Sequence, residues 1–415
     1  MSAARHSSAV QLKTEMEKRN MDFSLTQEQR AWQLKARKFA AEHIRPLSLK
    51  REQVADPKET WDWDLIRKGS EMGFRTLVVP KKFGGHEVDF VTQALVMAEL
   101  AKADSAISKA FSQNWKWSHL ISSSCNDDQK ERFLKPFVAD HSYVIGSAST
   151  EPNSGSDNRY PPAGSKFGYR LKAEREGSDW ILNGEKCFIA NGGIGKLFFV
   201  SARTDFTVPA REGMTVFLVP GDTPGFRFGK RFNKAGWRFY QNAELIFENA
   251  RVPSANVVGQ VNQGSKVRTG AATEFSDFEL ACNALGVCED ACEWALHYAR
   301  TTVRHGQALV NQQTIQLAIS RMHMETEALR TYCMRAAWEM DNELHDSPNI
   351  ILLMNYSSDV IQRVTSFNLD VHGAHGGAVP AYADKLVRDG IIWTHLAGDN
   401  TQRLKVMKRF PQKAA

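Results

Sequence analysis

Thr150-Glu151-Pro152-Asn153-Ser154-Gly155-Ser156-Asp157 is a short polar stretch at the start of a region with β-type patterns. Its glycine and its hydroxyl side chains indicate a turn that can present backbone N–H and O–H groups to a bound ligand. On its own, the stretch is also compatible with an ordinary polar turn at the surface. Whether the stretch binds a ligand therefore has to be judged from the segments on either side of it.

The region before this stretch is predicted to be helical. Thr26 is placed to cap a helix start, and a buried helix face is indicated by Leu95, Met97, Ala98, Leu100 and Ala101. We expect an N-terminal helical domain over residues 21–143. Residues 1–20 are polar and lack an apolar run, which predicts a disordered arm and not a secretory signal.

Residues 144–258 carry the pattern of β-strands and are predicted to form a middle domain. Short apolar runs predict strands at Leu197–Val200, Thr215–Val219 and Glu244–Phe247. The segment Trp180–Glu185 carries Asn183-Gly184 near its end, a dipeptide typical of a hairpin turn. We therefore expect the chain to reverse at this dipeptide.

Residues 259–415 return to a helical pattern, with apolar residues at steps of three and four. Leu280, Ala284, Leu285, Val287, Ala291 and Ala295 follow this spacing. A chain of 415 residues is longer than one compact core usually holds. The sequence thus predicts an α+β fold, mainly α, with helices before and after a β domain.

Composition excludes several classes of protein. Hydrophobic residues make up 42% of the chain and charged residues 24%, as in an ordinary globular protein. The net charge of +6 is spread along the chain without a basic block, so no nucleic-acid partner is expected. There is no apolar run of about 18 residues, so no membrane span is expected. The six cysteines lack zinc-site spacing, which predicts buried thiols in a reducing, cytoplasmic setting.

Three dispersed motifs, taken together, resemble those of the acyl-CoA dehydrogenases. The stretch Thr150–Asp157 resembles the TEPxxGSD signature of that family. Leu182–Gly193 resembles the INGxKxWITNGG strand, and Glu244–Pro253 resembles the ELxFexxxVP segment. Later helical segments also match, at Ala336–Asp341 and Lys385–Asp389. The resemblance spans about residues 22 to 410, which is nearly the whole chain.

The resemblance implies a fold, a cofactor and partners. The fold would comprise an N-terminal helical domain, a middle β-barrel domain and a C-terminal four-helix bundle. The cofactor would be FAD, the substrate an acyl-CoA, and the assembly a homotetramer or heterotetramer in which a neighbouring subunit contacts the adenine end. An electron-transfer flavoprotein is a possible electron acceptor.

The resemblance also assigns cofactor-binding residues. Those expected near the flavin are Ser147, Ser149, Thr150, Gly155, Ser156, Phe188 and Ala190; those expected toward the other end of the dinucleotide or in the late loop are Arg304, Gln313, Asp370, Val371, Gly373, Asp399 and Thr401. Several depart from the family pattern. Phe188 replaces a tryptophan and Ala190 a threonine, Arg304 lies two residues beyond the family's arginine, and Asp370 replaces a glutamine.

The catalytic glutamate of the family is missing at both of its known positions. In the loop after Arg388-Asp389, its position falls on Ala397, or on Leu396 when counted back from Gln402. At the alternative position, in the helix after the β domain, it falls on Ser276. Abstraction of a proton next to a thioester needs a nearby base in a dry pocket. Candidates for that base are Asp104, Asp277, Glu279, His375 and Asp399.

Four functions remain open at this point. The first is an acyl-CoA dehydrogenase with a relocated base that acts on a cyclic, branched or aromatic acyl group, for which Phe111, Trp115 and Trp117 could form a bulky pocket. The second is a flavin oxidase or monooxygenase on the same fold, which needs no such base. The third is a non-catalytic subunit of a mixed oligomer. The fourth is a flavoenzyme that eliminates a leaving group.

Overall fold

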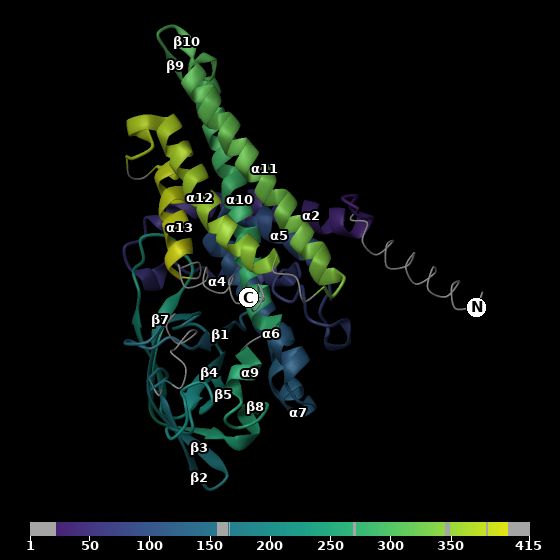
Figure 1. The fold of residues 1–415 in the computed structure, drawn as a ribbon, viewed down its shortest axis with the longest axis vertical. Helices are drawn as coiled ribbons and strands as arrows, with labels where there is room; N and C mark the ends of the chain where they lie inside the picture. Colours follow the sequence, from purple (N-terminus) through teal and green to yellow (C-terminus); the bar gives the residue numbers. More distant parts are fainter. Residues whose placement is uncertain are drawn as a thin grey trace, which may run out of the picture.

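The computed structural model describes residues 22–155, 165, 167–268, 271–344, 349–378 and 381–396. In Figure 1, the long C-terminal helices occupy the upper part of the molecule and the β-strands the lower part, with the N-terminal helices beside them. This order of helices, sheet and helices confirms the α+β fold expected from the sequence.

The N-terminal region is built from helices of very different lengths. They are α2 (Gln27–Phe39), α3 (Arg45–Glu52), α4 (Trp63–Glu71), α5 (Phe90–Ala103), α6 (Ser105–Ser124), α7 (Asp127–Gln129) and α8 (Lys135–Ala139). Thr26 caps α2 as expected, because its hydroxyl accepts a hydrogen bond from the Gln29 N–H and the Gln29 side chain returns one to the Thr26 backbone. The buried helices α5 and α6 connect this region to the rest of the molecule.

Eight strands form one mostly antiparallel sheet. They are β1 (Ile145–Ala148), β2 (Lys172–Glu176), β3 (Asp179–Ala190), β4 (Leu197–Arg203), β5 (Met214–Pro220), β6 (Phe226–Arg231), β7 (Asn242–Pro253) and β8 (Val257–Val258). The pairing order is β6-β7-β3-β2-β4-β5-β8, and β1 adds to β4 in parallel. The strands enclose an apolar core of their own, which includes Leu182, Val200, Phe217, Leu245 and Val252.

The hairpin turn predicted at Asn183-Gly184 is wrong. Strand β3 continues through both residues and keeps its pairing with β7. Gly184 has a φ of 131°, and the register with β7 shifts between Leu182 and Gly184, where β7 carries one extra residue, so the strand pair has a bulge here and the chain does not reverse. The chain turns earlier, at Gly177, whose φ of 62° suits the tight link between β2 and β3.

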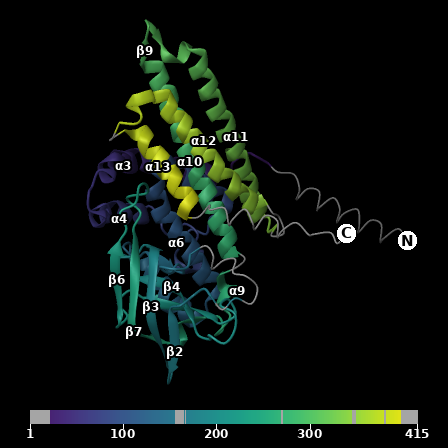
Figure 2. The ribbon, with the colours of Figure 1, turned by 60° about the vertical axis from the view of Figure 1, so that its left-hand side comes forward.

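The C-terminal region is a four-helix bundle. After the short α9 (Gly264–Arg268), it consists of α10 (Ala271–Thr301), α11 (Gln313–Asp341), α12 (Asn349–His372) and α13 (Tyr382–Leu396). A small hairpin, β9 (Val303–Arg304) and β10 (Gln307–Ala308), joins α10 to α11. Figure 2 shows these helices running side by side above the sheet.

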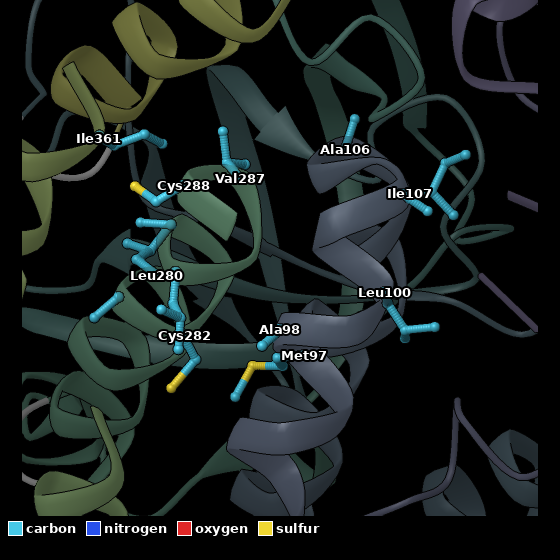
Figure 3. Close-up of a cluster of buried hydrophobic side chains, with 14 of the residues drawn as sticks. Met97, Ala98, Leu100, Ala106, Ile107, Leu280, Cys282, Val287, Cys288 and Ile361 are labelled. Carbon is cyan, nitrogen blue, oxygen red and sulfur yellow. The ribbon is translucent and has the colours of Figure 1, made fainter. Parts of the chain in front are cut away.

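The bundle and the N-terminal helices share one apolar core. Figure 3 shows some of its side chains from α5, α6, α10 and α12, among them Met97, Ile107 and Cys288. The helices α5 and α10 approach so closely at Gly286 that a Cβ there would lie 2.3 Å from the Ala98 carbonyl oxygen. This close packing fixes the middle of α10 against α5.

The structure bears on three expectations from composition. All six cysteines are buried thiols. Among the described residues, no cluster of His, Cys, Asp and Glu side chains could hold a metal ion. Within the same part of the chain, every helix is too short or too polar to cross a membrane.

Candidate active site

A cavity lies where α6, the sheet and the start of α10 meet. Its sheet side brings together five of the residues predicted to bind the flavin: Ser147, Ser149, Thr150, Phe188 and Ala190. They converge because Ser147 lies near the end of strand β1, Thr150 opens the turn that follows, and Phe188 and Ala190 lie at the end of β3. Gly155 follows the turn without lining the cavity, and Ser156 lies outside the described residues.

Phe188 offers a flat apolar surface at this cavity. Its ring is 48% exposed, and it stacks on Phe232 with 3.9 Å between the ring centroids and 20° between the planes. The Phe188 backbone has a φ of 55°, which is strained for a residue with a Cβ. Its carbonyl accepts a hydrogen bond of 2.9 Å from Asn242 Nδ2, which helps to hold this conformation.

The residues on the sheet side fit a flavin. A planar ring system can stack on the exposed face of Phe188, and hydroxyl groups that can bond its heteroatoms line the same cavity at Ser147, Ser149 and Thr150. Ala190 adds no side-chain donor, which is the departure noted in the sequence.

A buried ion pair fixes the turn that carries Thr150. Lys186 Nζ on β3 lies 2.7 Å from Glu151 Oε1, and both side chains are almost fully buried. Glu151 also accepts the backbone N–H groups of Arg170 at 2.7 Å and Leu171 at 3.0 Å. Burial lowers the pKa of Lys186 to about 8, although the Glu151 carboxylate opposes the shift. Both residues lie within the two quoted motifs, yet sequence reasoning did not pair them.

The helical side of the cavity is charged. Lys109, Gln113 and Lys116 of α6 line it at spacings of four and three residues, which places them on one helix face. Lys109 Nζ forms an ion pair of 2.7 Å with Glu279 Oε2 of α10, and Lys116 Nζ contacts Ser276 Oγ. Arg268 of α9 also lines the cavity. The spacing on α6 could have revealed the lysines, whereas Arg268 gave no local signal.

The structure separates the candidate bases. Asp277 lines the cavity and is 3% exposed, whereas Glu279 is fully buried and is held by Lys109 and Ser112. Asp104 was expected near the reacting group, but it caps α6 by accepting the backbone N–H groups of Ala106 and Ile107. It also forms a buried ion pair of 3.2 Å with Lys385, so it serves the fold and not the cavity.

The other candidates lie elsewhere. His375 is exposed in a short 3-10 helix beyond α12, at the far end of the bundle. Asp399, Ala397 and Thr401 lie outside the described residues, as does the rest of their loop. Of the aromatic residues expected to shape the pocket, Trp117 lines the cavity, but Phe111 and Trp115 are wholly buried in the core.

The remaining residues predicted to bind the cofactor gather at the other end of the bundle. Arg304 lies in the β9–β10 hairpin and Gln313 begins α11. Asp370, Val371 and Gly373 lie at the end of α12, where His372 stacks on Tyr298 of α10 with ring centroids 4.2 Å apart. Figure 1 shows this end at the top and the sheet at the bottom. All but Val371 are exposed.

The helix α10 sets the distance between these two groups. The cavity lies at Ser276 and Asp277, near the start of α10, whereas Arg304 follows its last residue, Thr301. At 1.5 Å per residue, the helix between them spans roughly 38 Å. One dinucleotide cannot bridge that distance, so both groups of residues can serve FAD only if a neighbouring copy supplies the second group.

Comparison with known proteins identifies one family over residues 26–410. The family models for the acyl-CoA dehydrogenase N-terminal, middle and C-terminal domains match residues 26–141, 146–250 and 262–410. An acyl-CoA dehydrogenase of Bacillus subtilis (strain 168) is 29% identical over 388 residues, which cover 92% of this chain and 98% of that protein.

Two solved structures share the fold. Butyryl-CoA dehydrogenase from Megasphaera elsdenii superposes with a TM-score of 0.86 at 28% identity, covering 94% of this chain and 99% of its own. A structure described as the electron transferring flavoprotein of Acidaminococcus fermentans has a TM-score of 0.87 at 29% identity, covering 95% and 100%. The chain therefore belongs to the acyl-CoA dehydrogenase superfamily, whose members are FAD-dependent oxidoreductases acting on CH–CH groups.

Proposed function

We propose that this protein binds FAD in the cavity and desaturates an acyl-CoA thioester, with Asp277 as the base that removes the α-proton. One observation carries the proposal: among the described residues that line the cavity, Asp277 is the only carboxylate. It is 3% exposed, so little water competes at this position.

Glu279 is a weaker candidate for the base because it is already engaged. Its carboxylate is bound by Lys109 at 2.7 Å and by the Ser112 hydroxyl, and it would have to leave both to reach a substrate. Asp277 lies two residues earlier on α10 and lines the cavity directly. Its position, next to the residue that aligns with the family's alternative glutamate, supports a shift of the base by one residue.

Each group of residues that lines the cavity would have a different role in the reaction. Ser147, Ser149 and Thr150 would bind and orient the flavin, and Phe188 would stack on it. When bound, FAD supplies the acceptor for the hydride that leaves the β-carbon. Asp277 would take the α-proton, while Trp237, Tyr240 and Leu280 would keep water from the acyl group. The aromatic rings at this end suit a cyclic, branched or aromatic acyl group.

Assembly and electron transfer belong to the same proposal. The separation of the two groups of cofactor residues supports an oligomer, homomeric or heteromeric, in which Arg304, Gln313, Asp370 and Gly373 of one copy contact the FAD of another. We propose a tetramer. An electron-transfer flavoprotein is the proposed electron acceptor, in keeping with the similar structure from Acidaminococcus fermentans.

The test is anaerobic reduction of the reconstituted FAD protein by a panel of acyl-CoA thioesters, followed by bleaching of the flavin spectrum. Asp277→Asn should retain FAD but slow reduction by about 10²- to 10⁴-fold, the usual contribution of a general base. Glu274→Gln, on the same turn of α10 but away from the cavity lining, is the matched control and should reduce normally.

Three outcomes would overturn the proposal. Normal reduction in Asp277→Asn would place the base elsewhere. A yellow protein that no thioester bleaches, but that NADH or a reductase bleaches, would indicate an oxidase or monooxygenase. Failure to bind FAD at all would indicate a non-catalytic subunit.

A further inference from the structure

One uncharged polar side chain of α6 lines the cavity without a hydrogen-bond partner. Gln113 is only 7% exposed, and within the part of the chain that the structure describes its side-chain amide makes no hydrogen bond. The polar residues on either side of it are satisfied by the protein: Ser112 donates to the Glu279 carboxylate, and Asn114 accepts the Ile145 N–H at 2.8 Å. Because Gln113 is otherwise buried, the cavity is where its amide can meet a partner.

A glutamine amide in this position makes the cavity sensitive to the chemistry of its ligand. The amide has N–H groups that donate and an oxygen that accepts, and a buried polar group without a partner is unfavourable. Water can serve both ends of an amide in an open cavity. A hydrocarbon chain that displaces such water leaves the amide without a partner, whereas a polar group at the same point restores a hydrogen bond.

Two contacts between α6 and α10 place this amide opposite the proposed base. Lys109 Nζ lies 2.7 Å from Glu279 Oε2, and Lys116 Nζ contacts Ser276 Oγ. The residue numbers rise along α6 as they fall along α10, so the two helices run antiparallel here. Gln113 lies between the two lysines, and the proposed base lies between their two partners. The amide therefore lies near the acyl part of a bound thioester, far from the CoA phosphates at the other end of the pantetheine arm.

We infer that Gln113 selects thioesters whose acyl group carries a hydroxyl. A hydroxyl meets the amide in either orientation, since it can accept from the N–H or donate to the oxygen. A plain alkyl chain offers neither bond, and the uncharged amide brings no charge to balance a carboxylate. The inference rests on the proposed function, because it names the class of acyl group that the site would take.

Binding can be measured without turnover by using CoA thioethers, in which a methylene replaces the thioester carbonyl. The probes are the thioether analogues of hexanoyl-CoA with a hydroxyl at the γ, δ or ε carbon, each matched to the analogue with a methyl group at the same carbon. Calorimetric titration of the purified protein with FAD present gives the affinities. In at least one pair, the hydroxyl analogue should bind at least about tenfold more tightly than its methyl partner.

Gln113→Leu and Gln113→Met remove the amide, so each should bring that preference within about twofold of none. Gln260→Leu makes the same change at an exposed position outside the cavity lining and should leave the preference intact. Equal affinity within all three pairs for the unaltered protein would overturn the inference, as would a preference that survives in both Gln113 variants. An equal loss of affinity for the hydroxyl and methyl analogues in those variants would also overturn it, because Gln113 would then serve only the shape of the site.

The absence of the carbonyl from the probes separates the inference from a second role for the amide. If Gln113 bound the thioester carbonyl, Gln113→Leu would slow flavin reduction by every acyl-CoA alike, and the thioether pairs would show no preference. The same measurements separate the inference from the proposed function. A preference for a hydroxyl analogue without flavin reduction by any thioester would keep the selection and reject the reaction. Flavin reduction by hexanoyl-CoA with no preference in any pair would keep the reaction and reject the selection.

Discussion

Lys186 and Glu151 form an ion pair of 2.7 Å that is almost completely removed from solvent and joins strand β3 to the turn carrying Thr150. The pair lies directly behind the sheet side of the cavity. Because Glu151 also accepts the backbone N–H groups of Arg170 and Leu171, it ties the turn to the segment that leads into β2. The positions of the hydroxyl groups that would meet a flavin therefore depend on a charge pair that a flavin would not touch.

Lys186→Met should destabilise the protein by about 3–5 kcal/mol, because the Glu151 carboxylate would remain buried without its cation. Urea unfolding of the apoprotein measures the loss. Adding Glu151→Gln to Lys186→Met should recover part of it, since a neutral amide is less costly to bury and can still accept a backbone N–H. A double variant no more stable than the single one would show that the charge of Glu151 is not the cause.

Lys234 should make stability depend on pH above neutrality. Its Nζ donates to the Tyr240 carbonyl and to Asn242 Oδ1, and burial of this charged end lowers its pKa from 10.5 to about 7. Between about pH 7 and 10.5 the unfolded chain binds this proton more tightly than the folded one, so this group makes stability rise with pH across that window. Thermal unfolding at pH 7 and pH 9.5 should show a smaller rise in Lys234→Met than in the unaltered protein. An equal rise in both would contradict the assignment.

Phe188 should contribute to FAD affinity through ring stacking. Phe188→Ala should weaken binding by about two- to tenfold, which corresponds to the 0.5–1.5 kcal/mol or so of one aromatic pair. Quenching of FAD fluorescence during titration of the apoprotein gives the affinity. Phe206→Ala is the control, because Phe206 is similarly exposed, at 46% against 48%, but does not line the cavity. Equal losses in the two variants would argue against stacking at Phe188.

The parts of the site that the sequence predicted are those carried by local motifs. Ser147, Ser149 and Thr150 follow one another on β1 and its turn, so a motif of a few residues determines their relative positions. The prediction of a hairpin at Asn183-Gly184 was wrong for a physical reason. A glycine in a strand can form either a turn or a bulge, and pairing with β7 on both sides of the dipeptide decides for the bulge.

The helical side of the cavity could not be predicted in the same way. Lys116 meets Ser276, 160 residues later in the chain, only because α6 packs beside α10. The role of Asp104 depends on a different tertiary contact, since its ion pair joins the start of α6 to Lys385 of α13. A carboxylate that caps a helix and one that faces a cavity have the same sequence signature, and only tertiary contacts separate Asp104 from Asp277.

Because of the length of α10, the fraction of subunits that hold FAD should depend on the concentration of the protein. With about 38 Å between the cavity and Arg304, an isolated subunit that binds FAD as proposed would lack the contacts from the second group of residues. Each FAD bound across two copies would then strengthen their association by the same factor by which association strengthens FAD binding. Dilution should release cofactor and subunits together, and added FAD should hold the oligomer together. The yellow colour of the protein would thus report its state of assembly.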